Sequence, residues 1–288
     1  MIKPELITLT FVSIFLAVQL LGLYIGAIYY EAIQVGMLQP LVDNPQDISN
    51  SIYLFLYMLT ATAIIILILK FRKNLLKIIE IFILFMSSWI TFSFLFPIAI
   101  WYIDLGLILS IILVLYKLLK HNFLSNTLSI IFSLSGVGAL LGASLGILPS
   151  ILFILIVSIY DFISVFLTKH MIFMAKSIVR TPTIFTLSIP SNLNVKLNES
   201  KNYGKKLSKV RVFNLGSGDI ALPLIFLVSV LNNYGLKYAL FSLVGVTIML
   251  FLLLNWRIKE TAIKPRALPA MPFLTVGLFL GFLISLVI

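Results

Sequence analysis

Runs of about 20 apolar residues, separated by short charged or turn-rich segments, recur along the whole chain. A helix of that length crosses the hydrocarbon core of a bilayer, which is about 30 Å thick. Of the 288 residues, 61% are hydrophobic and only 11% are charged, whereas about 25% of the residues of a soluble domain carry charge. The chain is therefore predicted to be an all-α polytopic membrane protein, with residues 1–288 forming a single membrane domain.

Nine transmembrane helices are predicted, six of them in residues 1–170 and three in residues 212–288, with a loop over residues 171–211 between the two groups. The third and fourth helices are divided at Phe96 and Pro97, because an undivided helix from Lys77 to Leu119 is too long for one crossing. The first span is too long for a cleaved signal peptide, and no small-residue cleavage site follows it. The predicted spans are 6–30, 51–70, 76–96, 98–119, 124–146, 149–170, 212–231, 235–256 and 269–288.

The basic residues predict the orientation of these helices. If the N-terminus is inside, every lysine and arginine except Lys237 falls on the inside, as the positive-inside rule requires. The net charge of +11 is then a topology signal, and no nucleic-acid partner is expected. We expect a multi-pass protein of the cell membrane, with the N-terminus and the 171–211 loop cytoplasmic and the C-terminus outside. The prolines and glycine of that loop predict that much of it is mobile.

Acidic residues inside membrane spans are rare and usually functional. Glu80 lies near an inside helix end, three residues after Lys77, and an interfacial ion pair accounts for it. Asp104 lies near an outer helix end beside Trp101 and Tyr102, which are typical interfacial aromatics. A structural role is favoured for both carboxylates.

Asp161 and Asp219 have no such explanation. They lie on antiparallel neighbouring spans, 149–170 and 212–231, about 12 Å and 10 Å from the inner helix ends by the helical rise. If the helices touch, the two carboxylates share one proton in a low-dielectric site. An aspartic protease uses such a pair, and a proton- or cation-coupled transporter uses intramembrane aspartates equally well. A non-catalytic pore or scaffold is the third class.

Three short motifs distinguish these classes. Asp161 follows Tyr160, Asp219 ends the tetrapeptide Gly216-Ser217-Gly218-Asp219, and Pro269-Ala270-Met271 opens the last span. Together, in this order and on these spans, they resemble the GxGD intramembrane aspartyl proteases, the presenilin and signal peptide peptidase family. The resemblance covers essentially the whole chain. Ser217 fills the variable position, and Met271 stands where the family has leucine, a change that keeps the side-chain volume.

The resemblance implies an endopeptidase that hydrolyses peptide bonds within transmembrane segments, with Asp161 and Asp219 as catalytic dyad. It also implies presenilin-like orientation, substrates with their N-termini outside, and, given the short loops, an archaeal homologue. The expected partners are transmembrane protein substrates and the lipid bilayer, with the chain acting alone or self-associating and needing no accessory subunit. No cofactor or metal is expected: the chain has no cysteine and no HExxH motif.

The residues around the aspartates have physical interpretations of their own. Gly216 and Gly218 permit close backbone approach or non-helical torsions, or they serve helix packing. Pro269 with its neighbour Pro272 leaves carbonyls free near the dyad, or simply starts a helix. Tyr160 either donates a hydrogen bond near the dyad or packs against a neighbour.

The segment Lys209–Asn214 is rich in β-branched residues and precedes the span that carries Asp219. A helical substrate must unwind before cleavage, and its exposed backbone then needs new partners. We therefore expect this segment to form a strand that pairs with the substrate, the alternative being a plain linker.

Overall fold

The computed structural model describes residues 4–71, 73–100, 103–120, 122–166, 186–190, 212–260 and 269–287. Over these ranges the chain forms nine helices and four short strands. The helices are α1 (Pro4–Gln34), α2 (Ser49–Phe71), α3 (Lys73–Leu95), α4 (Leu105–Leu119), α5 (Phe123–Ala143), α6 (Ile147–Phe166), α9 (Ser217–Tyr234), α10 (Leu236–Glu260) and α11 (Met271–Val287). The strands are β1 (Ala99–Ile100), β2 (Ile103–Asp104), β3 (Thr186–Pro190) and β4 (Val212–Gly216).

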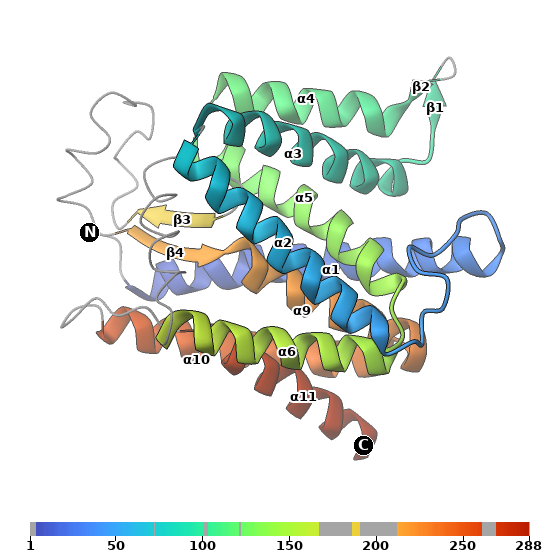
Figure 1. Ribbon diagram of the computed structural model, residues 1–288, viewed down its shortest axis with the longest axis vertical. Helices are drawn as coiled ribbons and strands as arrows, with labels where there is room; N and C mark the ends of the chain where they lie inside the picture. The colour runs from blue at the N-terminus through green and yellow to red at the C-terminus, as the bar shows by residue number, and fades with distance from the viewer. Residues whose placement is uncertain are drawn as a thin grey trace.

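The predicted all-α polytopic architecture is confirmed. Seven of the described helices are long and apolar enough to cross a membrane, and α4 and α11 are shorter, with 15 and 17 residues. Figure 1 shows α9 inside the bundle, with α1 and α5 close to it, α3 and α4 on one side, and α6, α10 and α11 on the other.

The predicted helix over 98–119 is wrong at its beginning. Ala99–Ile100 and Ile103–Asp104 form an antiparallel hairpin, and the helix begins only at Leu105. Asp104 caps α4: its Oδ1 accepts a hydrogen bond from the Gly106 amide at 2.9 Å, and its Oδ2 accepts one from Trp89 Nε1 at 2.8 Å and another from Ser93. Such a cap favours helix initiation after the aspartate rather than before it, so the structural role expected for Asp104 is confirmed.

The predicted helix over 212–231 is also wrong at its beginning. Val212–Gly216 is strand β4, which pairs antiparallel with β3, and the helix runs from Ser217 to Tyr234. An extended residue advances about 3.3 Å where a helical one advances about 1.5 Å, so the depth of Asp219 does not follow from a helical rise counted from Val212. Most of the loop expected to be mobile, residues 171–211, lies outside the described residues, as does the Lys209–Arg211 part of the expected strand.

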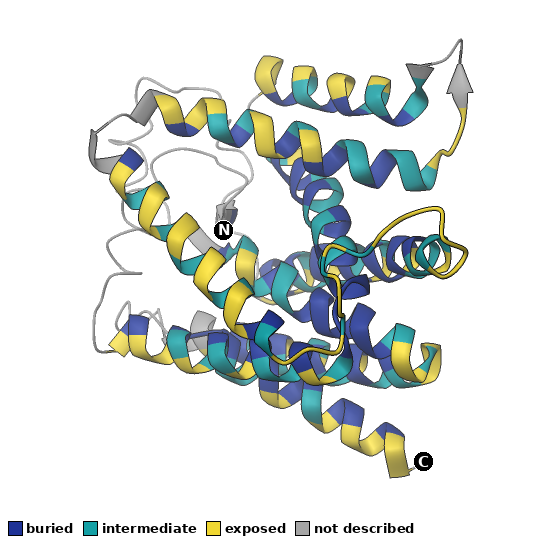
Figure 2. Ribbon diagram, turned by 45° about the vertical axis from the view of Figure 1, so that its right-hand side comes forward, coloured by how far each residue is buried: buried dark blue, intermediate teal, exposed yellow. Residues whose placement is uncertain are grey.

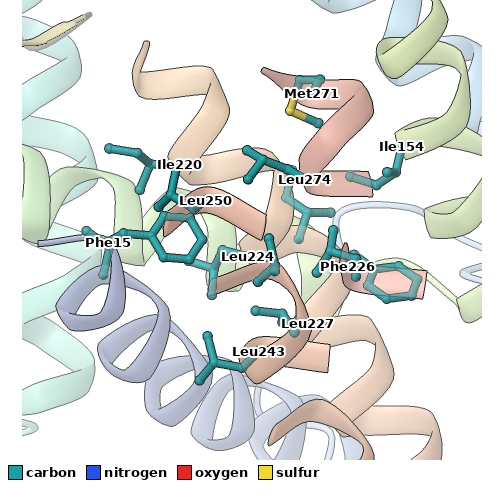
Figure 3. Packing of buried hydrophobic residues seen from close by; sticks show 14 of the residues in the cluster. Phe15, Ile154, Ile220, Leu224, Phe226, Leu227, Leu243, Leu250, Met271 and Leu274 are labelled. Atoms are coloured by element: carbon teal, nitrogen blue, oxygen red, sulfur yellow. The ribbon is translucent and has the colours of Figure 1, made fainter. Parts of the chain in front are cut away.

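Helix α9 forms the centre of the apolar core. Ile220, Leu224, Leu227 and Val228 are all fully buried, and Figure 3 shows the first three packed among side chains from α1, α6, α10 and α11. Glycines allow the neighbouring helices to approach: a Cβ at Gly22 or Gly26 of α1, or at Gly138 or Gly142 of α5, would lie within 2.3–2.6 Å of an α9 atom. Small residues at such positions are how membrane helices pack closely.

Helix α2 contrasts with α9. Only 11% of its most apolar window is buried, and Figure 2 shows an exposed face along most of its length, whereas α9 is dark with buried residues. Its described neighbours are α3 and α6. In a membrane, the exposed apolar side chains of α2 face lipid.

Glu80 has a charge partner on another helix that was not expected. The residue is only 8% exposed, and its charge acts on Lys117 of α4, which is equally buried and donates a hydrogen bond to Asn126 of α5. Glu80, Lys117 and Asn126 therefore form a buried polar cluster that links α3, α4 and α5. Burying a charge requires such a partner, because an unpaired one would be costly.

Candidate active site

Asp161 lies on α6, in the interior of the bundle, with only 4% of its surface exposed. Its Oδ2 accepts a hydrogen bond from the backbone N–H of Met271 at 3.1 Å. Met271 is the first residue of α11, so a contact across 110 residues of sequence joins the sixth predicted span to the last. Asp161 is therefore held at the start of α11.

The Met271 amide is available because of where α11 begins. The first N–H groups of a helix have no partner within the helix, and the next residue, Pro272, has no N–H to lose. Pro269, Ala270 and Met271 are all buried, and the Ala270 carbonyl accepts from the Leu274 amide at 3.1 Å. The Pro269-Ala270-Met271 element thus contacts Asp161 through a backbone N–H donor. We had expected this element to offer free carbonyls.

The role of a backbone amide also explains the tolerance for methionine at position 271. The Met271 side chain is 2% exposed and packs in the core (Figure 3), while its backbone N–H donates the hydrogen bond to Asp161. Leucine and methionine fill similar volumes, and neither changes the amide.

Asp219 lies in the first turn of α9, directly after β4. It is half-buried, in contrast to Asp161. Helix α9 packs against both α6 and α11, so the elements that carry Asp161, Asp219 and the Met271 amide contact one another. In Figure 3, Ile220, the residue after Asp219, and Met271 both lie toward the upper edge of the apolar cluster.

Each carboxylate therefore lies beside a helix N-terminus: Asp219 in the first turn of α9, and Asp161, carried on α6, at the start of α11. Unpaired N–H groups and the helix dipole make such positions favourable for negative charge, which offsets part of the cost of ionisation in an apolar interior. The hydrogen bond from the Met271 amide to Oδ2 of Asp161 adds to this effect.

The two glycines before Asp219 differ in what surrounds them. A Cβ on Gly216 would lie 3.2 Å from Oδ2 of Asp219, whereas a Cβ on Gly218 would meet only Leu222 Cδ1 at 4.0 Å. Gly216 has an ordinary extended conformation, with φ −67° and ψ 143°. The absence of a side chain at Gly216 therefore leaves room for the Asp219 carboxylate. Within the described residues, no backbone from another element lies close to either glycine.

Gly216→Ala is expected to reduce the cleavage rate about tenfold, equivalent to about 1.4 kcal/mol, by displacing the Asp219 carboxylate. The thermal unfolding midpoint should change little, because the added methyl meets a side-chain end rather than packed backbone. Gly218→Ala is the matched control, with the same chemical change and more space, and its effect on the rate should be clearly smaller. Equal effects of the two substitutions on the rate would contradict this assignment.

Tyr160 has an aromatic neighbour on another helix. Its ring meets Phe55 of α2 edge to face, with 5.6 Å between centroids. The packing interpretation of Tyr160 is therefore supported. Ser217 begins α9 and is half-buried.

One polar residue near the site was not singled out from the sequence. Gln19 of α1 is fully buried and donates from Nε2 to the Ile220 carbonyl at 2.8 Å. The sequence did contain a signal for Gln19, because it is an amide side chain inside the apolar span 6–30. Among the described residues, no group of three or more His, Asp or Glu side chains is arranged to hold a metal ion.

Comparisons with known proteins agree with this fold. The family model described as "Signal-peptide peptidase, presenilin aspartyl protease" matches residues 12–288. Two crystal forms described as a presenilin family intramembrane aspartate protease are similar in fold. The first, in space group C222, has a TM-score of 0.64 and 21% identity, covering 98% of each chain. The second, in P2, has a TM-score of 0.63 and 23% identity, covering 96% of each chain.

No curated protein matches the chain at a comparable level. The family match nevertheless spans almost the whole sequence, and it includes all the residues of the candidate site. The transporter alternative finds no support in these matches. The chain belongs to the signal-peptide peptidase and presenilin family of aspartyl proteases.

Proposed function

We propose that Asp161 and Asp219 are the catalytic dyad of this intramembrane aspartyl protease, and that Gly216, Ser217, Gly218, Pro269, Ala270 and Met271 support it. The observation that carries the proposal is the hydrogen bond from the Met271 amide to the buried Asp161 carboxylate. It brings the Pro269-Ala270-Met271 element to one aspartate, while α9 carries the other aspartate against the same two helices. Tyr160, whose ring packs against Phe55 of α2, is proposed as a further supporting residue beside Asp161.

The dyad hydrolyses a peptide bond with one proton shared between its members. One carboxylate takes a proton from water as the water oxygen attacks the carbonyl carbon, and the other gives its proton to the carbonyl oxygen. The resulting gem-diol returns one hydroxyl proton to the dyad, the dyad protonates the nitrogen, and the C–N bond breaks. The products are a carboxylic acid and an amine, and the dyad regains its starting protonation.

Strand β4 supplies a backbone partner for an unwound substrate. Within the described residues, β4 pairs along one edge with β3, from Pro190 opposite Val212 to Thr186 opposite Gly216. It ends where α9 begins, next to Asp219. A substrate strand added to the other edge of β4 would run past the dyad, with main-chain hydrogen bonds replacing those lost on unwinding.

Val212→Pro removes one backbone donor from β4. We expect cleavage efficiency to fall about tenfold. This corresponds roughly to the free energy of one lost hydrogen bond together with the shift of the backbone around the proline. Val212→Thr keeps the amide and the β-branched shape and is the control. Unaltered turnover in the proline variant, measured with a membrane-spanning peptide, would count against pairing through β4.

We further propose that the protein is a single-domain, multi-pass protein of the cell membrane, with the N-terminus and the 171–211 loop cytoplasmic and the C-terminus outside. The distribution of basic residues supports this orientation. The substrates are transmembrane proteins, and the chain acts alone or self-associates without an accessory subunit.

A cleavage assay in lipid vesicles tests the proposed function. Purified protein is reconstituted with one transmembrane segment presented in either orientation, and products are mapped by mass spectrometry. We expect cleavage within the segment, faster when its N-terminus lies on the side of the enzyme's C-terminus. Absence of any intramembrane product would overturn the proposal, and equal rates in both orientations would overturn only the orientation.

A further inference from the structure

Gln19 occupies an unusual position for an amide. It lies within α1, is 0% exposed, and donates from Nε2 to the carbonyl of Ile220, a residue 201 positions away in sequence. Burying an amide costs free energy that a leucine or methionine would not incur, unless hydrogen bonds compensate. Within the described part of the chain the amide makes only this one bond, because Oε1 accepts none.

The carbonyl that receives this bond belongs to the turn that carries Asp219. That turn is weakly held by its own helix in two respects. The N-cap residue, Gly216, has no side chain to bond the first amides. Pro223 has no N–H, so it cannot donate to the carbonyl four residues before it, as a helical residue usually does. A hydrogen bond from α1 therefore acts in a turn that receives one bond fewer from its own helix.

The surrounding packing explains why Gln19 can reach this carbonyl. Gly22 and Gly26 follow Gln19 on α1, and a Cβ on either would collide with Leu224 or Val228 of α9, at 2.3 Å and 2.5 Å. Residues 19, 22 and 26 of α1 thus face residues 220, 224 and 228 of α9, turn by turn. The close approach brings the α1 backbone near enough for one amide side chain to span the gap.

We infer that Gln19 is a positioning residue for Asp219. Its hydrogen bond to Ile220 fixes the first turn of α9, and so the place of the carboxylate relative to Asp161. The inference rests on the proposed catalytic role of Asp219. Gln19 itself takes no part in the proton transfers.

Three variants test this role. Gln19→Met keeps the length of the side chain and removes the donor. Gln19→Glu donates only when its carboxyl group is protonated. Ser229→Ala is the matched control: Ser229 lies on α9 itself, several turns beyond Asp219, and donates to the Leu145 carbonyl at 3.0 Å from a fully buried position.

For Gln19→Met we expect kcat to fall about 10–100-fold while KM stays within about twofold of wild type. The substitution disturbs the alignment of Asp219 with Asp161 but leaves substrate binding intact. Ser229→Ala should keep the wild-type kcat while lowering the unfolding midpoint by a similar amount. The rate of Gln19→Glu relative to wild type should rise about tenfold as pH is lowered and the new carboxyl becomes a donor, whereas the ratio for Gln19→Met should stay flat. Ratios are used because Asp161 and Asp219 also titrate.

Wild-type kcat in Gln19→Met, or an equal loss of kcat in Ser229→Ala, would overturn the inference. If Gln19→Met does not fold, the pH dependence of Gln19→Glu decides: a flat ratio to wild type overturns the positioning role. The failure of the proposed dyad is distinguishable, since it would appear as cleavage surviving in Asp161→Asn and Asp219→Asn, whatever Gln19 does.

Discussion

Asp219→Asn is expected to abolish cleavage, with kcat at least about 10³-fold below wild type. Asparagine has nearly the same shape as aspartate but cannot exchange the proton that the reaction passes between water, dyad and substrate. The helix should tolerate the change, since Asp219 is half-buried in the first turn of α9 and asparagine suits a helix N-terminus. Asp161→Asn should be equally inactive, and the double variant no worse than either, because the two residues act as a unit.

The measurement is the initial rate of cleavage of a membrane-spanning peptide, together with a thermal unfolding curve for each variant. Asp43→Asn is the control, because Asp43 is exposed in the loop between α1 and α2; its rate should stay within about twofold of wild type, as is usual for surface changes. Cleavage that persists in both dyad variants would refute the assignment of Asp161 and Asp219.

Met271→Pro is expected to lower kcat about 10–100-fold by removing the N–H that donates to Asp161. Proline suits the first turn of a helix, so α11 should still begin at this residue. The buried Asp161 carboxylate would then lose an amide partner in an apolar setting, where each lost donor is costly.

Met271→Leu and Met271→Ala separate the amide from the side chain. Both keep the N–H; leucine also keeps the volume, whereas alanine leaves a cavity that should cost about 2–5 kcal/mol of stability. We expect Met271→Leu to cleave at close to the wild-type rate, and Met271→Ala to be less stable but still more active than Met271→Pro. Equal rates in the proline and alanine variants would show that the side chain, not the amide, matters.

The helices were predictable because membrane burial leaves a strong signal in composition. Apolar runs of sufficient length predicted all nine described helices, seven of them to within four residues at each end, and also the break after α3, which ends at Leu95 just before Pro97. The candidate aspartates were also predictable, since a carboxylate in such a run demands an explanation. Both inferences depend only on local sequence and on the solvent that surrounds it.

The parts that were missed depend on contacts between distant residues. The β-branched residues of Lys209–Asn214 predicted a strand, and β4 forms from Val212 onward, but its pairing with Thr186–Pro190 is one that no local pattern reveals. Glu80 was assigned to Lys77 because both lie on one helix, whereas the buried partner Lys117 comes from the next. The importance of the Met271 amide was equally hidden, because every residue but proline has one.

The hydrogen bond between Met271 and Asp161 also has a consequence for biosynthesis. Ribosomes deliver the helices in order, so α6 and α9, with both aspartates, enter the membrane before α11 supplies the amide. Until that helix is inserted, the Met271 amide cannot reach Asp161. The hydrogen bond that joins α6 to α11 therefore forms only after the last helix has entered the membrane.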